Sequence, residues 1–166
     1  MIKIDNVLVA TDFGKASDSA LAYGREFARS FGARLHVVHV VENPLIWVGP
    51  EAGTIDLVQM QKDLEDAAAR QMDRLLTVED RQQLRAVSTI RTGRTAALEI
   101  VGQAKLVNAD VIIMGTHGRR AINHLVMGSV AEKVVRLAPC PVLTVRHPEH
   151  EFIQPDALQS VEHARQ

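Results

Sequence analysis

Continuous runs of apolar residues alternate along this chain with longer segments in which apolar residues recur every three or four positions. Runs of the first kind are typical of strands that are covered on both faces of a parallel sheet. The second spacing predicts helices with one buried face. The runs predict strands at residues 2–10, 34–41, 84–91, 111–114 and 141–146.

The segments between these strands predict helices. The first helix begins near Ser17 and ends at Gly32, which occupies the position just past a helix. The second covers residues 55–76, the third follows Thr95 as its N-cap, and the last covers residues 128–138. The residues that we expect to be buried in the first three helices are Ala20, Leu21, Gly24, Phe27, Ala28 and Phe31; Leu57, Met60, Leu64, Ala67, Ala68 and Leu75; and Ala97, Ile100, Val101 and Ala104.

Strands and helices alternate in this pattern, and no internal repeat is visible. The alternation predicts an α/β fold, with a single doubly wound, Rossmann-like parallel sheet of five strands and helices on both faces. We expect residues 1–147 to form this domain and the polar residues 148–166 to form a C-terminal tail. Residues 43–54 contain Trp47, two prolines and two glycines, and suit an irregular flap that either packs over the end of the sheet or meets a partner.

Glycines bracket the chain that follows the fourth predicted strand. Gly115 ends that strand, Gly118 follows shortly after, and Gly128 with Ser129 begins the next helix. Glycines let a ligand approach the main chain closely, and the N–H groups at a helix N-terminus attract anions. The segment therefore suits the phosphates of a nucleotide. The same residues also suit a tight strand exit and a helix cap, so the spacing alone leaves both interpretations open.

The composition narrows the range of partners. A length of 166 residues with 46% hydrophobic residues suits one domain with an ample core. The net charge of −1 gives no reason to expect nucleic acid or an anionic membrane as a partner. Because the sequence shows no signal peptide and no apolar run of about 18 residues, we expect a cytoplasmic protein. Cys140 is the only cysteine and lies between two prolines, which favours a buried, inert thiol.

Several catalytic motifs are missing from the sequence. It contains no GxxxxGK[ST] of P-loop nucleotide hydrolases, no GxGxxG after the first strand and no GxSxG elbow. His36, His39 and His124 have no metal-like spacing with one another or with the carboxylates. We therefore assign no catalytic residue and no metal ligand. A bound nucleotide would act as a signal, with weak hydrolysis at most.

The glycine pattern is one of three blocks that resemble a known family. The motif G-x2-G-x9-G-S at residues 115–129 is similar to the ATP-binding signature of the universal stress protein family, and GTHGRR and GSVAEKVVRLAPCPVLTV resemble its C-terminal block. VLVATDF at residues 7–13 and HVVE at residues 39–42 agree with it. The resemblance implies the strand order 3-2-1-4-5, with the reversal between strands one and four. It also implies a homodimer that forms through the last strand, from Pro141 to Val145.

The resemblance further implies an ATP site at this reversal, with ADP or AMP as alternative ligands and the option of Mg²⁺ bound through the phosphates. Asp12 would accept hydrogen bonds from adenine or ribose or help to hold a divalent ion, although a capping role near the first helix also suits it. Ala10 and Thr11 would offer main-chain groups, and Val40 would contact the base. The other implied residues are Met114 as a packing neighbour; Gly115, His117 and Gly118 at the ribose and α-phosphate; and Gly128, Ser129, Val130 and Ala131 at the β- and γ-phosphates.

Three functions fit these observations. The first is a nucleotide-sensing regulatory module in the stress response, in which ATP orders the glycine loop and changes a surface that partners recognise. The second is a homodimeric interaction protein that works without a nucleotide. The third is a slow ATPase or an adenylating relative on the same fold. The enzyme ranks last because the sequence offers no base that is placed to activate water.

Overall fold

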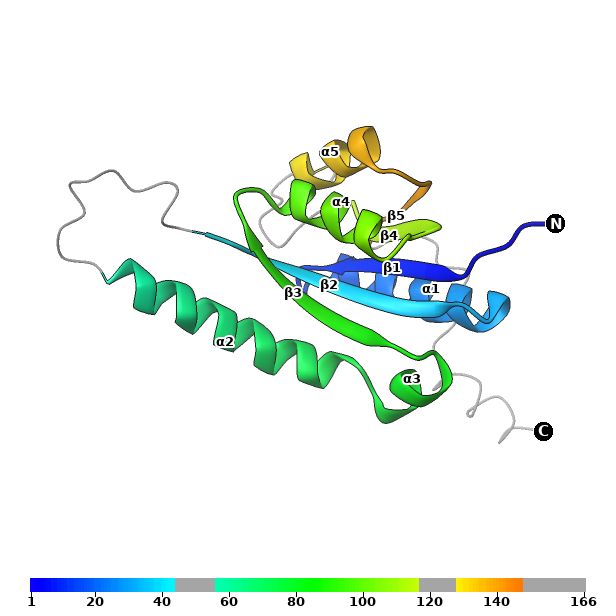
Figure 1. Cartoon of the computed structure of the whole chain (residues 1–166), viewed down its shortest axis with the longest axis horizontal. Coiled ribbons are helices and arrows are strands. Elements are labelled where there is room, and N and C mark those ends of the chain that lie inside the picture. Colours follow the sequence, from blue (N-terminus) through cyan, green and yellow to red (C-terminus); the bar gives the residue numbers. More distant parts are fainter. Residues whose placement is uncertain (44–55, 117–127, 148–166) are drawn as a thin grey trace.

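The computed structural model describes residues 1–43, 56–116 and 128–147, in which a layer of strands lies between helices (Figure 1). The strands are β1 (Asn6–Thr11), β2 (Arg34–Glu42), β3 (Val87–Gly93), β4 (Val111–Gly115) and β5 (Val142–Val145). The helices are α1 (Lys15–Phe31), α2 (Leu57–Leu75), α3 (Val78–Gln83), α4 (Ala96–Leu106) and α5 (Ser129–Leu137).

All five strands are parallel and lie in the order β3-β2-β1-β4-β5, which confirms the predicted fold class. β1 lies at the centre, because β2 pairs with it on one side and β4 on the other. The strand order therefore reverses between β1 and β4, and ligands of such sheets bind beyond the carboxyl ends of the strands at this point. β5 begins directly after Pro141 and forms one edge of the sheet, where a proline is tolerated.

Alternate residues of β1 face opposite sides of the sheet and belong to two separate cores. Val7 and Val9 lie in the core that α1 and the end of α2 contribute to. Leu8 and Ala10 lie in the core that α4 and α5 contribute to. Figure 1 shows α4 and α5 together on one side of the sheet and α2 on the other. Cover on both faces explains why the sequence of this strand is a continuous apolar run.

Some element boundaries differ from those that we expected. β1 begins at Asn6 and α1 begins at Lys15, two residues before Ser17. The short helix α3 was not expected, because six residues are too few to show a helical period. It begins with a capping box, in which Thr77 Oγ1 accepts from Asp80 N at 3.0 Å and Asp80 Oδ2 accepts from Thr77 N at 2.9 Å. β3 accordingly starts three residues later than predicted.

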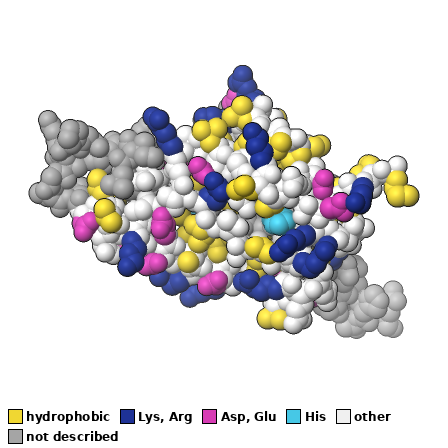
Figure 2. All heavy atoms as spheres, in the orientation of Figure 1, with side chains coloured by type: hydrophobic (Ala, Val, Ile, Leu, Met, Phe, Trp, Pro, Cys, Tyr) yellow, Lys and Arg dark blue, Asp and Glu magenta, His cyan; other side chains and the backbone are white. Residues whose placement is uncertain are grey.

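The predicted buried stripe of α2 is wrong in its first half. Met60 is 37% exposed and Leu64 is 45% exposed, whereas the buried residues of this helix are Gln61, Ala68 and Met72. The sheet contact is made largely by the second half of α2, and the first half extends past the sheet (Figure 1). Figure 2 shows apolar side chains lying among acidic and basic ones over this helix.

The helix ends agree only in part with the predicted caps. Gly32 follows α1 with φ 64°, as expected, but Phe31 on the last turn is 42% exposed and not buried. Thr95 occupies the N-cap position of α4, yet its hydroxyl bonds to none of the described groups, and Glu42 Oε1 accepts from Ala96 N at 3.1 Å. The expected inner face of α4 is confirmed, since Ala97, Ile100, Val101 and Ala104 are all buried.

In the three described stretches, no helix has both the length and the apolar surface that crossing a bilayer requires. His117 and Gly118 of the predicted site lie outside the described residues. So do the predicted flap, apart from Asn43, and the predicted tail at residues 148–166.

Candidate functional site

The carboxyl ends of β1 and β4 lie side by side. Ala10 and Met114 are the last residues that pair between these two strands. The chain therefore leaves the sheet through Thr11 and Asp12 on one side and through Gly115 and Thr116 on the other. The structure brings these two segments to one edge, at the point where the strand order reverses.

The N-terminus of α5 lies at the same edge. The Gly128 amide donates a hydrogen bond to the Thr116 carbonyl at 2.8 Å, although residues 117–127 separate them in the sequence. Gly128 is the N-cap, with φ −61° and ψ 145°, and Ser129 is the exposed first residue of the helix. The N–H groups of a first helical turn carry partial positive charge, which can bind an anion. The edge therefore combines a helix N-terminus with the end of the central strand.

Side chains close the turn between β1 and α1. Thr11 Oγ1 accepts from Phe13 N at 3.0 Å, and Asp12 Oδ1 accepts from Gly14 N at 3.0 Å. Ser17 Oγ accepts from Gly14 N at 3.1 Å and donates to Gly14 O at 2.8 Å. Asp12 therefore helps to close the turn before α1, whose N-cap is Gly14. A role toward a ligand stays a prediction for this residue.

Close packing against α1 requires a glycine at position 115, whether or not a ligand binds there. A Cβ at this position would lie 2.9 Å from Ala16 Cβ and 3.0 Å from the Ala16 carbonyl carbon. The end of β4 thus approaches the first turn of α1 more closely than any other residue would allow. The sequence located Gly115 but gave no signal for Ala16, because nothing in the pattern indicates which helix crosses the strand end.

Several residues of the predicted site belong to the core between the sheet and the helices α4 and α5. It includes Ala10, Met114 and Ala131, which are buried, and Val40 and Val130, which are partly buried. Main-chain groups are therefore the principal contacts that these residues can offer a ligand. Val40 is the first residue of β2 past its pairing with β1, which ends at Thr11 and His39.

Two further residues at this edge were given no role from the sequence. The ring centroids of Phe13 and His39 lie 4.3 Å apart, with the planes inclined by 35°. His39 Nδ1 lies 2.8 Å from Thr11 O, and because a carbonyl only accepts, Nδ1 carries the proton. Phe13 has φ 61°, a left-handed conformation that bulky residues rarely adopt. Nothing in the sequence signals this conformation at a phenylalanine.

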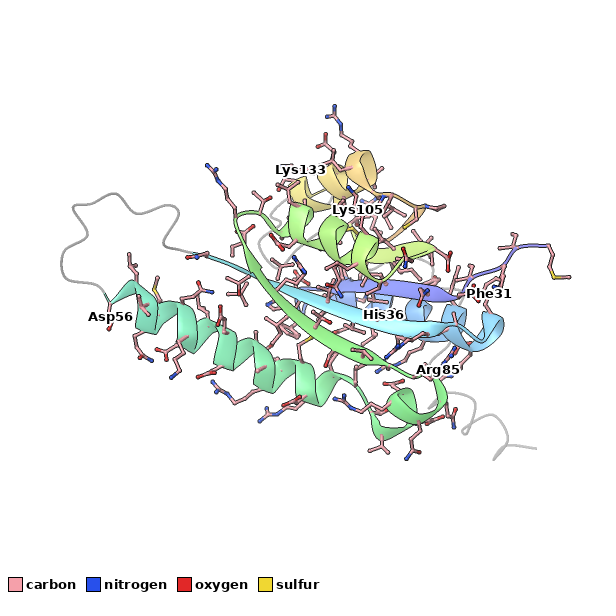
Figure 3. All side chains as sticks on the ribbon, viewed as in Figure 1. Phe31, His36, Asp56, Arg85, Lys105 and Lys133 are labelled. Atoms are coloured by element: carbon pink, nitrogen blue, oxygen red, sulfur yellow. The ribbon has the colours of Figure 1, made fainter. Side chains whose placement is uncertain are left out.

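The other described histidine of β2 lies away from this edge. His36 is near the start of the strand (Figure 3), and its Nε2 lies 3.1 Å from Asn6 Oδ1. Burial, and to a lesser extent the charge of Arg34, lowers the pKa of His36. No cluster of three or more His, Cys, Asp or Glu side chains that could hold a metal occurs among the described residues.

Comparisons with known proteins agree with the fold and show the family. The sequence matches the universal stress protein family over residues 3–146. A universal stress protein of Thermus aquaticus is 33% identical over 150 residues, which cover 84% of this chain and 97% of the relative.

Solved structures of the same family share the fold. A universal stress protein of Lactobacillus plantarum has a TM-score of 0.70 at 21% identity, with 88% of this chain and 100% of that chain covered. The universal stress protein of Archaeoglobus fulgidus in complex with dAMP has a TM-score of 0.60 at 24% identity, with 87% and 99% covered. On the sequence match and the relative from Thermus, this chain belongs to the universal stress protein family.

Proposed function

We propose that this chain binds an adenine nucleotide, foremost ATP, and acts as a nucleotide-sensing regulatory module in the stress response. The observation that carries the proposal is the hydrogen bond from Gly128 N to Thr116 O, which holds the N-terminus of α5 at the end of β4, the strand that pairs with β1. The relative from Archaeoglobus fulgidus supports it, because that protein was solved with dAMP on a similar fold.

In the proposed complex the phosphates meet the first turn of α5. Ser129 would donate its hydroxyl, and the amides of this turn would bind the β- and γ-phosphates. The ribose and α-phosphate would lie near Gly115, together with His117 and Gly118 outside the described residues. The base would lie near Val40, with Asp12 as an acceptor toward the base or ribose. Mg²⁺ would bind through the phosphates, since the described residues offer no carboxylate or histidine cluster for it.

The nucleotide acts as a signal in this proposal. Binding changes the surface at this edge of the sheet. The module would work in the cytoplasm as a homodimer through β5. That strand supports the proposal because it forms a sheet edge in which Val142 and Leu143 are only partly buried, and pairing with a second copy would cover such an edge.

Two measurements test nucleotide binding. Mass spectrometry of the small molecules released from the freshly purified, denatured protein should detect ATP, ADP or AMP. Thermal unfolding should move to higher temperature when ATP and Mg²⁺ are added, because a ligand at 100 times its Kd stabilises by about 2.7 kcal/mol. An unchanged melting curve at millimolar ATP, with no co-purified nucleotide, would contradict the proposal.

A pair of charge variants tests whether α5 is the phosphate site. Ser129→Asp adds a negative charge to the first turn of α5, which suits the helix but repels phosphates, so we expect ATP affinity to fall by about tenfold or more. Val58→Asp adds the same charge to the first turn of α2 at a residue that is 70% exposed, and should leave affinity unchanged. Equal affinity of the Ser129→Asp variant and the wild type would place the phosphates elsewhere.

A further inference from the structure

Two rings brace the turn that follows β1. Phe13 comes from the turn and His39 from the end of β2, and their centroids are 4.3 Å apart. Phe13 also packs against the core on the α1 side of the sheet. The contact therefore ties the turn to the neighbouring strand on the face opposite to Val40, which packs against the α4 and α5 core.

His39 holds the turn in two ways at once. Its Nδ1–H donates to Thr11 O at 2.8 Å, and its ring face supports Phe13. Phe13 adopts φ 61°, and a bulky residue keeps such a conformation only when its surroundings fix it. The ring contact with Phe13 and the hydrogen bond to Thr11 O supply that support from one side chain.

The conformation of Phe13 decides where Asp12 points. Phe13 N donates to Thr11 Oγ1 at 3.0 Å, and Gly14 N donates to Asp12 Oδ1 at 3.0 Å, so both hydrogen bonds depend on the dihedral angles between them. A return of Phe13 to negative φ would redirect the Gly14 amide away from the Asp12 carboxylate. The carboxylate would then lose its hydrogen bond from Gly14 N.

We infer that His39 and Phe13 are a positioning pair that preorganises Asp12 for the nucleotide, an inference that rests on the proposed function. His39 acts through Thr11 and Phe13 and not through contact with the ligand. The pair affects affinity by setting the fraction of ATP-free molecules in which the turn already has the binding conformation. If loss of the pair reduces that fraction to a tenth, the Kd for ATP rises about tenfold.

Three substitutions separate the two parts of the pair. His39→Phe keeps a ring beside Phe13 and removes the donor to Thr11, and His39→Asn keeps a donor near the place of Nδ1 and removes most of the ring. Phe13→Asn removes the other ring but tolerates positive φ. We expect His39→Phe and His39→Asn each to raise the Kd for ATP by about tenfold. Phe13→Asn should raise it less, because asparagine adopts positive φ without the support of a second ring. His36→Gln, which changes a histidine of the same strand away from the turn, is the matched control and should leave the Kd unchanged.

A double-mutant cycle with Asp12→Asn distinguishes positioning from a general loss of stability. If His39 acts by orienting Asp12, His39→Phe has little further effect on the Kd once Asp12 is replaced. Additive effects, in which His39→Phe weakens binding equally in both backgrounds, would overturn the inference. Melting temperatures of the ATP-free variants show how much of each effect is structural.

Amide NMR resonances of the ATP-free protein test the positioning pair separately from the proposed nucleotide binding. His39→Phe should move the signals of Asp12, Phe13 and Gly14, whereas His36→Gln should not. Unchanged turn signals in the His39 variants would overturn the positioning pair, whatever ATP does. A wild-type protein that binds no adenine nucleotide would overturn the proposed function, and the role of the pair in binding would fall with it.

Discussion

The guanidinium of Arg25 in α1 holds the carboxylate of Asp80 in α3 through two hydrogen bonds, Nε to Oδ1 at 2.9 Å and Nη2 to Oδ2 at 2.7 Å. Arg25 also donates to Leu75 O at 3.0 Å at the end of α2. The Asp80 side chain is 3% exposed. One side chain of α1 therefore fixes the short helix that leads into β3.

Replacing Arg25 with methionine should destabilise the protein by about 3 kcal/mol at neutral pH, because it leaves a buried carboxylate without its charged partner. Urea unfolding measures the loss. Arg29→Met on the same helix is the control, since its pair with Glu26 is much more exposed and contributes less than about 1 kcal/mol. Equal losses in the two variants would contradict the buried pairing.

The same pair predicts a loss of stability in acid. Burial alone would raise the pKa of Asp80, but the hydrogen bonds from Arg25 and from the Thr77 amide outweigh it and hold the pKa below its ordinary value. This stabilisation is fully present above about pH 3.9, the pKa of an unfolded aspartate, and is lost as the pH falls through the lower folded pKa. Asp80→Asn should remove this part of the acid dependence. Parallel stability curves for the variant and the wild type across this window would contradict it.

His36 predicts a second pH dependence, at a higher pH. Burial and the charge of Arg34 lower its pKa, so the unfolded chain binds a proton that the folded chain does not. Its contribution favours folding above about pH 6.5 and declines as the pH falls toward the folded pKa. As the pH falls from about 7.5 to about 5.5, the unfolding free energy of the His36→Gln variant should therefore rise relative to that of the wild type. A difference that stays constant over this range would contradict the prediction.

Gly115→Ala should destabilise the protein by about 1 to 3 kcal/mol, because the new Cβ would lie 3.0 Å from the Ala16 main chain. Gly102→Ala in α4 is the matched control. Among the described residues outside its own helical turn, the new Cβ would meet only Arg91 Nη2, at 3.9 Å. The change should therefore stabilise the helix by about 0.5 to 1 kcal/mol. Opposite signs in urea unfolding support the close approach of β4 and α1, and a neutral Gly115→Ala variant would rule it out.

The start of α4 gives a prediction that reverses the one from sequence. Thr95 looks like an N-cap, but Glu42 Oε1 accepts from Ala96 N, and the Thr95 hydroxyl is buried without a partner among the described residues. Thr95→Val should therefore change stability by less than about 0.5 kcal/mol or increase it. Glu42→Ala should cost about 1 kcal/mol. A large loss at Thr95 with none at Glu42 would restore the sequence-based assignment.

The sequence predicted those parts of the fold in which burial is nearly complete. β1 and β4 are covered on both faces, so their apolar runs located them, and the alternation of elements predicted the parallel sheet. α2 was harder, because only part of it meets the sheet and Leu64 stays exposed although it fits the apolar stripe. α3 depends on the long-range pair of Arg25 and Asp80, which no local pattern indicates.

The candidate site was likewise predicted only in part. The glycine motif pointed to Gly115 and Gly128, and the structure places both at the end of β4. The left-handed Phe13 and its contact with His39 were not predicted, because they depend on how two strand ends meet in space. Sequence spacing thus indicated which main-chain groups face the edge, but not which side chains fix the turn.

Amide resonances of the wild-type protein during titration with ATP and Mg²⁺ test the central claim most directly. The account predicts that the signals of Asp12, Gly115 and Gly128, with their neighbours in the first turn of α5, shift together along one binding curve. Signals of α3 and of the first half of α2 should stay in place. A titration to millimolar ATP that moves no signal, or moves only signals distant from this edge, would contradict it.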